Sequence, residues 1–261
     1  MSSIVYEVFA VRFATANRRR QDNFFYAVEE DPQGSMALDF FVWLIVGNGK
    51  VVLVDTGFSQ TSSLVRGRPY VIEPAVALHQ LGYPTETVQD VVVTHLHYDH
   101  AGNVGDYAHA RIWLQERELQ FATGKCMCDP RLSNFFATDD IALLLKRLYR
   151  GDVRLLDGNH TLHDGIELYA IGGHTDGLQV VRVRTARGWV LLASDAAHFY
   201  ENLDAKNPFP AVFSMEDMLD GYALIEGLVD DHDCIVPGHD PKVCERYPLA
   251  IPSCPYAYRI A

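Results

Sequence analysis

Four residues of metal-ligand type lie close together in the segment 94–103, which reads THLHYDHAGN. An apolar run precedes this segment and predicts a strand. Residues two apart in an extended chain point to the same side, so His95 and His97 can reach one metal ion. Asp99 and His100 follow where the chain turns into a helix, and they can reach a second ion.

Three more residues of the same kind follow at wide intervals, each at the end of a run that reads as a strand. His174 lies in IGGHTDG, Asp195 ends WVLLASD, and His239 lies in CIVPGHD. Functional groups gather at strand ends in α/β architectures. A single histidine usually has no ligand role, but imidazole and carboxylate groups in this number and pattern predict a zinc, manganese or iron site.

The motif and its spacing to the later ligands, with an early Asp-Thr-Gly at Asp55, resemble the metallo-β-lactamase superfamily, most of all its N-acyl-homoserine-lactone lactonase branch. This resemblance implies two divalent metal ions, with Zn²⁺ expected and Mn²⁺ or Fe²⁺ as alternatives. It assigns His95, His97 and His174 to one ion, Asp99, His100 and His239 to the other, and Asp195 to a bridge between them. Asp55 is expected to accept a hydrogen bond from a ligand histidine, with a turn-forming role as the alternative.

The elements that must position these residues alternate between strands and helices, and they fall into two similar halves. This order predicts an α/β fold, the αβ/βα four-layer sandwich, as one domain over residues 1–261. Strands are predicted at 4–13, 38–46, 50–54, 111–114, 153–156, 166–171, 178–184 and 189–194, and a last one ends at His239; helices are predicted at 74–81, from about 115, at 139–150 and at about 214–228. The sequence Gly47-Asn48-Gly49 predicts a tight hairpin turn.

Composition limits the classes of partner and compartment. The chain has 261 residues and a formal net charge of −12, with 22 basic against 34 acidic residues, so nucleic acid is not an expected partner. No apolar run approaches a membrane span, and Glu7 and Arg12 interrupt the N-terminal apolar stretch, so a cytoplasmic enzyme is predicted. Five cysteines are expected to be reduced, mostly buried thiols, and the reactivity of Cys126 and Cys128 is left open.

The chemistry expected of such a centre is hydrolysis. Two metal ions that share a carboxylate lower the pKa of a bridging water and polarise a carbonyl group. The predicted reaction is the opening of a small lactone ring by a metal-bridging hydroxide, with Asp99 as the proton carrier. A thioesterase, an amide or β-lactam hydrolase, a mononuclear iron sulfur dioxygenase and a non-catalytic metal protein are the alternatives. A quorum-quenching role and a homodimer are compatible with this reading.

Three segments that lie largely outside the predicted strands and helices are rich in aromatic residues, namely 24–41, 121–138 and 198–213. These residues are predicted either to line a substrate pocket for an apolar or aromatic group, or to form small hydrophobic clusters beneath long loops. The basic run Arg18-Arg19-Arg20 is predicted to be a solvated turn, with a border of the pocket as the alternative.

One position departs from the lactonase pattern. Those enzymes place a tyrosine three residues after the bridging aspartate, where its hydroxyl assists the substrate oxygen. Here that position is His198, and Tyr200 follows two residues later. His198 is predicted to donate a hydrogen bond to the substrate's carbonyl or leaving oxygen, and to be able to hand over a proton. The alternative is that His198 only packs or hydrogen-bonds to a ligand carboxylate and that Tyr200 fills the catalytic role.

Overall fold

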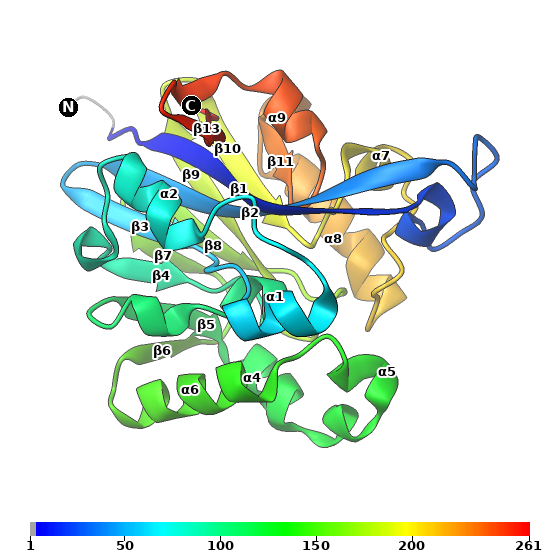
Figure 1. Cartoon of the computed structure of the whole chain (residues 1–261), viewed down its shortest axis with the longest axis horizontal. Coiled ribbons are helices and arrows are strands. Elements are labelled where there is room, and N and C mark those ends of the chain that lie inside the picture. Colours follow the sequence, from blue (N-terminus) through cyan, green and yellow to red (C-terminus); the bar gives the residue numbers. More distant parts are fainter. Residues whose placement is uncertain (1–3) are drawn as a thin grey trace.

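The computed structural model describes residues 4–261, and it consists of two β-sheets packed face to face with helices on their outer faces (Figure 1). The larger sheet has the order β12-β13-β1-β2-β3-β4-β5-β6 and the smaller β11-β10-β9-β8-β7. The strands are β1 (Glu7–Arg19), β2 (Ser35–Gly47), β3 (Lys50–Val54), β4 (Asp90–Val92), β5 (Arg111–Gln115), β6 (Val153–Leu156), β7 (His160–His163), β8 (Ile166–Ala170), β9 (Gln179–Thr185), β10 (Gly188–Ser194), β11 (Ile235–Pro237), β12 (Leu249–Ile251) and β13 (Cys254–Arg259).

Nine α-helices and five short 3-10 helices connect these strands in the described part of the chain. The α-helices are α1 (Gln60–Arg66), α2 (Pro74–Gln80), α3 (Tyr98–Ala101), α4 (Glu116–Thr123), α5 (Pro130–Ser133), α6 (Thr138–Tyr149), α7 (Tyr200–Asp204), α8 (Met215–Gly227) and α9 (Lys242–Arg246); the 3-10 helices are η1 (Arg20–Asn23), η2 (Thr85–Thr87), η3 (Val104–Asp106), η4 (Lys125–Cys128) and η5 (His232–Cys234). The predicted helix at 214–228 begins as expected, because the hydroxyl of Ser214 accepts a hydrogen bond from the backbone N–H of Asp217.

Three hydrophobic clusters separate four layers, which confirms the predicted αβ/βα sandwich. Alternate residues of β2 face opposite ways, so Val42 and Leu44 pack under α2 and α6 while Trp43 and Ile45 face the smaller sheet. On the far side of the smaller sheet, α8 covers the outward residues of β9 and β10. Strands that are buried on both faces read as nearly continuous apolar runs, which is why the sequence predicted these strands well.

The N-terminal strand differs from its prediction. It was expected at 4–13, but β1 continues to Arg19 and pairs with β2 along its whole length, with a bulge between Arg12 and Ala14. Beyond the bulge, every second side chain is exposed, so this half lacks the apolar run of a buried strand. The predicted turn at Arg18-Arg19-Arg20 is therefore wrong, because the first two arginines end a strand and Arg20 begins η1. These arms of β1 and β2 extend beyond the sheets in Figure 1.

The hairpin turn was predicted correctly, since Asn48 and Gly49 both have positive φ values, 49° and 69°, between β2 and β3. Several short elements were not predicted. Among them, β12 and β13 form a C-terminal hairpin that extends the larger sheet beside β1. Short edge strands carry little periodic signal, and their pairing partners are far away in the sequence.

The carboxyl ends of β3, β4, β8, β10 and β11 meet at one edge of the sandwich and carry the residues of the site. The loops after these strands contain Asp55, the 94–103 segment, His174, Asp195 and His239 respectively. Gln179 joins the two sheets at this edge, because its backbone N–H donates to Thr94 and its side-chain amide donates to the carbonyl of Val93.

Two further expectations concern the rest of the chain. All five cysteines are free thiols, but only Cys234 and Cys254 are buried, and Cys128 is exposed. From residue 4 onward, no helix has the length and apolar character that crossing a bilayer requires.

Candidate metal centre

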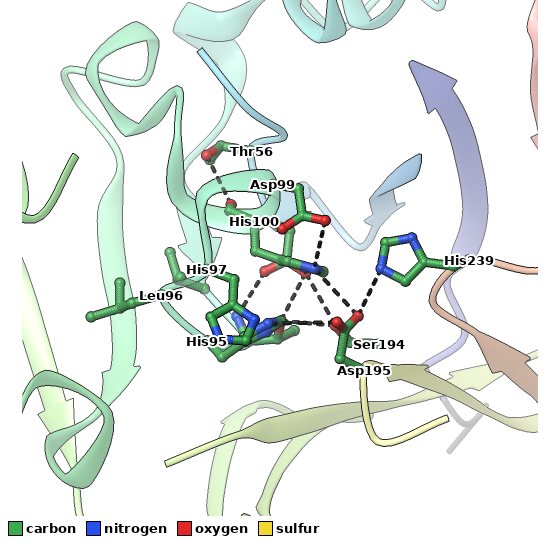
Figure 2. Close-up of polar contacts among 12 residues, drawn as sticks. Thr56, His95, Leu96, His97, Asp99, His100, Ser194, Asp195 and His239 are labelled. Atoms are coloured by element: carbon green, nitrogen blue, oxygen red, sulfur yellow. Dashed lines mark hydrogen bonds and ion pairs between the residues drawn. The ribbon is translucent and has the colours of Figure 1, made fainter. Parts of the chain in front are cut away.

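All seven predicted ligands lie together in one buried cluster, and Figure 2 labels all of them except His174. Their ligand atoms fall into overlapping groups, in each of which every atom lies within 4.8 Å of the others. These groups are His95, His97, His174 and Asp195; Asp99, His100 and His239; and Asp195, His198 and His239. The third group was not predicted, and it places His198 beside the predicted ligands.

The two oxygens of Asp195 face different sets of histidines. Oδ2 lies 3.1 Å from Nε2 of His174 and 3.7 Å from Nε2 of His95. Oδ1 lies 3.0 Å from Nε2 of His239 and 3.3 Å from Nε2 of His100. The carboxylate, labelled Asp195 in Figure 2, is therefore placed to be shared by two ligand sets.

These distances fit metal coordination. Ligand atoms that share a zinc ion at about 2.0–2.1 Å lie about 3.3 Å apart in a tetrahedron. Nδ1 of His97 is 3.0 Å from Nε2 of His174, and Nε2 of His100 is 3.9 Å from Oδ2 of Asp99. In addition, Nε2 of His95 and Nε2 of His100 are buried without a hydrogen-bond partner. An unpaired buried nitrogen is costly, so the residues present fit divalent metal ions.

Backbone carbonyls orient two of the histidines. Nδ1 of His174 lies 2.6 Å from the carbonyl oxygen of Ala211, and Nδ1 of His239 lies 2.7 Å from that of Asp39. A carbonyl oxygen can only accept, so each Nδ1 carries the proton. This tautomer leaves the Nε2 lone pair of each ring free for a metal ion.

Asp55 orients a third histidine, as predicted. Its Oδ2 lies 2.7 Å from Nδ1 of His100 and accepts a hydrogen bond from Thr94 Oγ1 at 2.8 Å. Its Oδ1 accepts the backbone N–H of Thr94 at 2.7 Å, and Ser194 Oγ lies 2.9 Å from Thr94 Oγ1. Asp55 and Ser194 both have positive φ, 60° and 45°, which is strained for residues with a Cβ. This network therefore ties the ends of β3, β4 and β10 together behind the ligands.

Glu118, in α4, is a fully buried carboxylate that the sequence analysis did not identify. Oε1 accepts the backbone N–H of Leu96 at 2.9 Å, and Oε2 accepts that of Gly177 at 3.0 Å. Glu118 therefore joins the loop of His95 and His97 to the loop of His174. A sequence signal existed, because Glu118 shares the buried side of its helix with the apolar residues around it.

Replacing Glu118 with glutamine should weaken metal binding roughly 10- to 100-fold. The new amide group can accept at only one of its two positions, so one of the two loop N–H groups would face an NH₂ donor. Competition with a chromogenic chelator measures the metal affinity. Glu116→Gln, at an exposed position of the same helix, is the matched control. Equal metal affinity in the two variants would contradict this positioning role.

Burial and neighbouring charges set the protonation of the ligands. Burial lowers the pKa of His95 and of His97 well below the usual value, and neighbouring histidines lower it further. Burial opposes a charge on Asp195 as well, but the histidines around it, His198 foremost, hold its pKa well below the usual value. Neutral imidazole and ionised carboxylate are the forms that bind metal ions, so the site favours the ligand forms of these three residues. At His100 burial is outweighed by the charges of Asp195 and Asp55, which raise its pKa well above the usual value.

His198 faces the ligands, whereas Tyr200 does not. Nε2 of His198 lies 3.0 Å from Oδ2 of Asp195, and its ring stacks on Phe209 with centroids 3.9 Å apart. Burial lowers the pKa of His198 to about 3, which favours a neutral ring whose single N–H points at Asp195. Tyr200 packs between the two sheets under the guanidinium of Arg246, 3.8 Å from its ring.

A pocket of about 560 Å³, open to solvent, lies over the ligands. Of the predicted aromatic residues, Phe135 and Phe209 line it, while Phe121, Phe136 and Phe213 line a smaller apolar annex beside His97 and His174. Others belong to the hydrophobic core, namely Phe24, Phe40, Phe41 and Phe199. Both readings of the aromatic segments were therefore partly right.

The other side of the pocket is basic, and the only sign of this in the sequence was the alternative interpretation of Arg18-Arg19-Arg20 as a border of the pocket. Arg18, Arg66 and Arg68 line it together with Tyr98 and Asn134. Arg18 comes from the run predicted to be a solvated turn, so the alternative reading, a border of the pocket, is the correct one. No local sequence pattern brings Arg18 to the other two, because β1 and α1 meet only in the folded chain.

Comparison with known proteins identifies the family of the chain. A sequence profile described as the metallo-β-lactamase superfamily matches residues 41–239. A probable metallo-hydrolase of Mycobacterium tuberculosis is 29% identical over 247 residues, covering 80% of this chain and 76% of that protein. An N-acyl homoserine lactonase of Bacillus cereus is 25% identical over 235 residues, covering 83% and 88%.

A solved structure extends the likeness to the fold of nearly the whole chain. It is an N-acyl homoserine lactone hydrolase with the product N-hexanoyl-L-homoserine bound at its catalytic metal centre. The TM-score is 0.77 at 20% sequence identity, over 95% of this chain and 98% of that one.

Proposed function

The chain belongs to the metallo-β-lactamase superfamily and is a metal-dependent hydrolase, and from this premise we propose that it opens the ring of a small lactone at a centre of two divalent metal ions. The observation that carries the proposal is the position of Asp195, whose two oxygens face two separate sets of histidines. A bridging carboxylate between two ligand sets is the arrangement that a two-metal hydrolase needs.

The proposed ligand sets are those given by the sequence. His95, His97 and His174 hold one ion, Asp99, His100 and His239 hold the other, and Asp195 is shared. Zinc fits this mixture of imidazole and carboxylate ligands best. When bound, such ions would supply a hydroxide nucleophile at neutral pH and polarise the substrate carbonyl.

Residues of the chain supply the remaining steps. Asp99, which lines the pocket beside the ligands, takes the proton released during attack and returns it to the leaving alkoxide. His198 has its ring held against Phe209 and its Nε2 3.0 Å from Oδ2 of Asp195, so its single N–H points at that carboxylate and is proposed to be shared with a substrate oxygen bound beside it. In a lactone the leaving alkoxide stays attached to the product, so a positioned donor and one proton complete the reaction.

Two similar proteins support this substrate class, since the Bacillus cereus protein is an N-acyl homoserine lactonase and the solved structure is an N-acyl homoserine lactone hydrolase. The apolar annex formed by Phe121, Phe136 and Phe213 gives room for an apolar part of the substrate. We propose no nucleic acid substrate, because 34 acidic residues outnumber 22 basic ones.

Removal of metal should abolish turnover, and zinc should restore it. Protein purified without chelator is expected to contain close to two metal ions per chain by elemental analysis. The same preparation is tested against aliphatic and aromatic lactones, a thioester, a phosphodiester and a β-lactam, before and after dialysis with chelator. A stable content of one ion per chain would contradict the two-metal centre. Faster hydrolysis of the thioester or phosphodiester, by orders of magnitude, would contradict the lactone assignment.

A further inference from the structure

Three arginines on one wall of the pocket lack a carboxylate partner. Arg18, Arg66 and Arg68 all line the pocket above the ligands, and within residues 4–261 no acidic oxygen lies within 4.0 Å of their nitrogens. The other arginines without a carboxylate partner in the described residues, such as Arg150, are exposed to solvent, whereas the buried Arg147 pairs with Asp152 at 2.9 Å. Unpaired, half-buried guanidinium groups at a binding site indicate an anion that the folded chain does not itself supply.

The arginines differ in how much of their donor capacity is used. Arg66 donates to the carbonyl oxygens of Asn134 at 2.7 Å and Phe136 at 3.4 Å, so its position is fixed by backbone. Arg68 donates from one nitrogen to the hydroxyl of Tyr98. Arg18 makes no side-chain hydrogen bond among the described residues, and its guanidinium lies 4.8 Å from the ring of Phe209. Arg18 and Arg68 therefore keep free donors for a ligand.

The end of α1 fixes the backbone from which Arg66 and Arg68 project. Gly67 adopts a left-handed conformation with φ 60°. Its N–H bonds to the carbonyl of Leu64 at 3.3 Å, and the N–H of Arg68 bonds to that of Ser63 at 3.0 Å. This pair of bonds is the Schellman ending of a helix. The hydroxyl of Ser63 also donates to the carbonyl of Arg68 at 2.8 Å, so the loop is held from both sides.

Aromatic rings connect this wall to the metal centre. The ring of Phe209 contacts both Arg18 and His198, and the centroid of Phe40 lies 5.1 Å from the guanidinium of Arg68 and 5.2 Å from the ring of His239. Each of these two guanidinium groups therefore shares an aromatic neighbour with a residue of the metal centre. A group bound by the arginines would be a substituent of the substrate, separate from the bond that is cleaved.

Charge repulsion supports the same reading. Burial lowers the pKa of Arg18, and the nearby positive charge of Arg68 lowers it further. Two unpaired cations that face one pocket repel each other, and a bound anion would relieve this repulsion.

We propose that Arg18 and Arg68 bind a carboxylate carried by the substrate, with Arg66 as a positioning residue, so that the enzyme prefers lactones with an anionic side chain. This inference rests on the proposed lactone hydrolysis and narrows its substrate class. A guanidinium group presents parallel N–H donors that match the two oxygens of a carboxylate. The basic wall and the apolar annex then receive different parts of one substrate.

The test uses two lactones that differ in one group. One γ-butyrolactone has a side chain that ends in a carboxylate, and the other has the primary amide in its place. The metal-loaded enzyme is expected to show a kcat/KM roughly 10- to 100-fold higher for the carboxylate, the range of a hydrogen bond to a charged group. Arg18→Gln and Arg68→Gln should each reduce this ratio roughly 10-fold, mainly through KM.

Two comparisons separate a charge effect from a folding effect. Arg68→Lys keeps the charge but loses the paired donors, so it should recover part of the preference. Arg150→Gln removes an exposed arginine beyond the end of α6 and should leave the ratio unchanged. Calorimetric binding of the two ring-opened compounds to the metal-loaded protein gives the same comparison without turnover.

The outcomes distinguish this inference from the proposed function. Equal kcat/KM values for both lactones, with no change in the arginine variants, would overturn the inference and leave lactone hydrolysis intact. Failure to open either lactone would overturn the proposed function instead. In that case the inference stands if the ring-opened form of the carboxylate lactone binds more tightly than the ring-opened form of the amide lactone and Arg68→Gln removes the difference. It is overturned if the two ring-opened compounds bind equally.

Discussion

Replacing Asp195 with alanine should release metal from both sites and lower turnover roughly 10³–10⁴-fold, the loss that follows from several kcal/mol of Lewis-acid stabilisation. Asp195 is the only predicted ligand whose oxygens face both sets, at 3.1 Å from His174 and 3.0 Å from His239. Its removal takes away a shared ligand and the negative charge that offsets two cations. Elemental analysis and steady-state kinetics on the same preparation measure the two effects.

The control for this variant is Asp220→Ala, which removes an exposed carboxylate from α8 and should leave metal content and turnover unchanged. Circular dichroism of the Asp195 variant shows whether the fold is kept. Loss of one ion with full retention of the other would mean that Asp195 belongs to one site alone, and the bridging assignment would then be wrong.

Replacing His198 with alanine should lower turnover roughly 10²–10⁴-fold with metal content intact, the range of a positioned proton donor or acceptor. Nε2 of His198 lies 3.0 Å from Oδ2 of Asp195, and stacking on Phe209 holds the ring over the pocket. Burial keeps the His198 ring neutral, with its pKa lowered to about 3. A neutral ring still carries one N–H, which is all that a hydrogen-bond donor needs.

Tyr200→Phe is the matched comparison for His198→Ala. It removes only a hydroxyl, and the ring of Tyr200 packs in the core between the sheets rather than in the pocket. Turnover near that of the parent enzyme is expected. A large loss in Tyr200→Phe, together with normal turnover in His198→Ala, would move the role to the tyrosine. Loss of one metal ion in His198→Ala would instead make His198 a ligand.

The sequence alone predicted the layers of the fold and the set of ligand-type residues. Strands such as β3 and β10 have apolar runs that bury both faces, and this signal is local. Asp55 and Asp195 follow such runs directly, so the strand ends also fixed their place at one edge of the sandwich. Within the 94–103 segment, the period of an extended chain was enough to group His95 with His97.

Contacts between segments that are distant in the sequence decided which other residues support or face the metal centre. Glu118 joins the loop of Leu96 to the loop of Gly177, two residues that are 81 positions apart. The spacing of apolar residues along the sequence does not predict such a contact. His198 and Tyr200 are two residues apart, but α7 begins at Tyr200, and this change from loop to helix directs the His198 ring to the metal centre and the Tyr200 ring to the core.

The arginine-lined wall of the pocket shows most clearly what the sequence determines and what only the tertiary structure decides. The sequence determined that Arg18, Arg66 and Arg68 are charged, but not that they lack partners or share a pocket. That depends on the continuation of β1 past its bulge and on the left-handed end of α1, which bring the three side chains to one side of the ligands. Local patterns set the type of each element and which of its faces is buried, whereas the neighbours of a side chain follow only from how the elements pack.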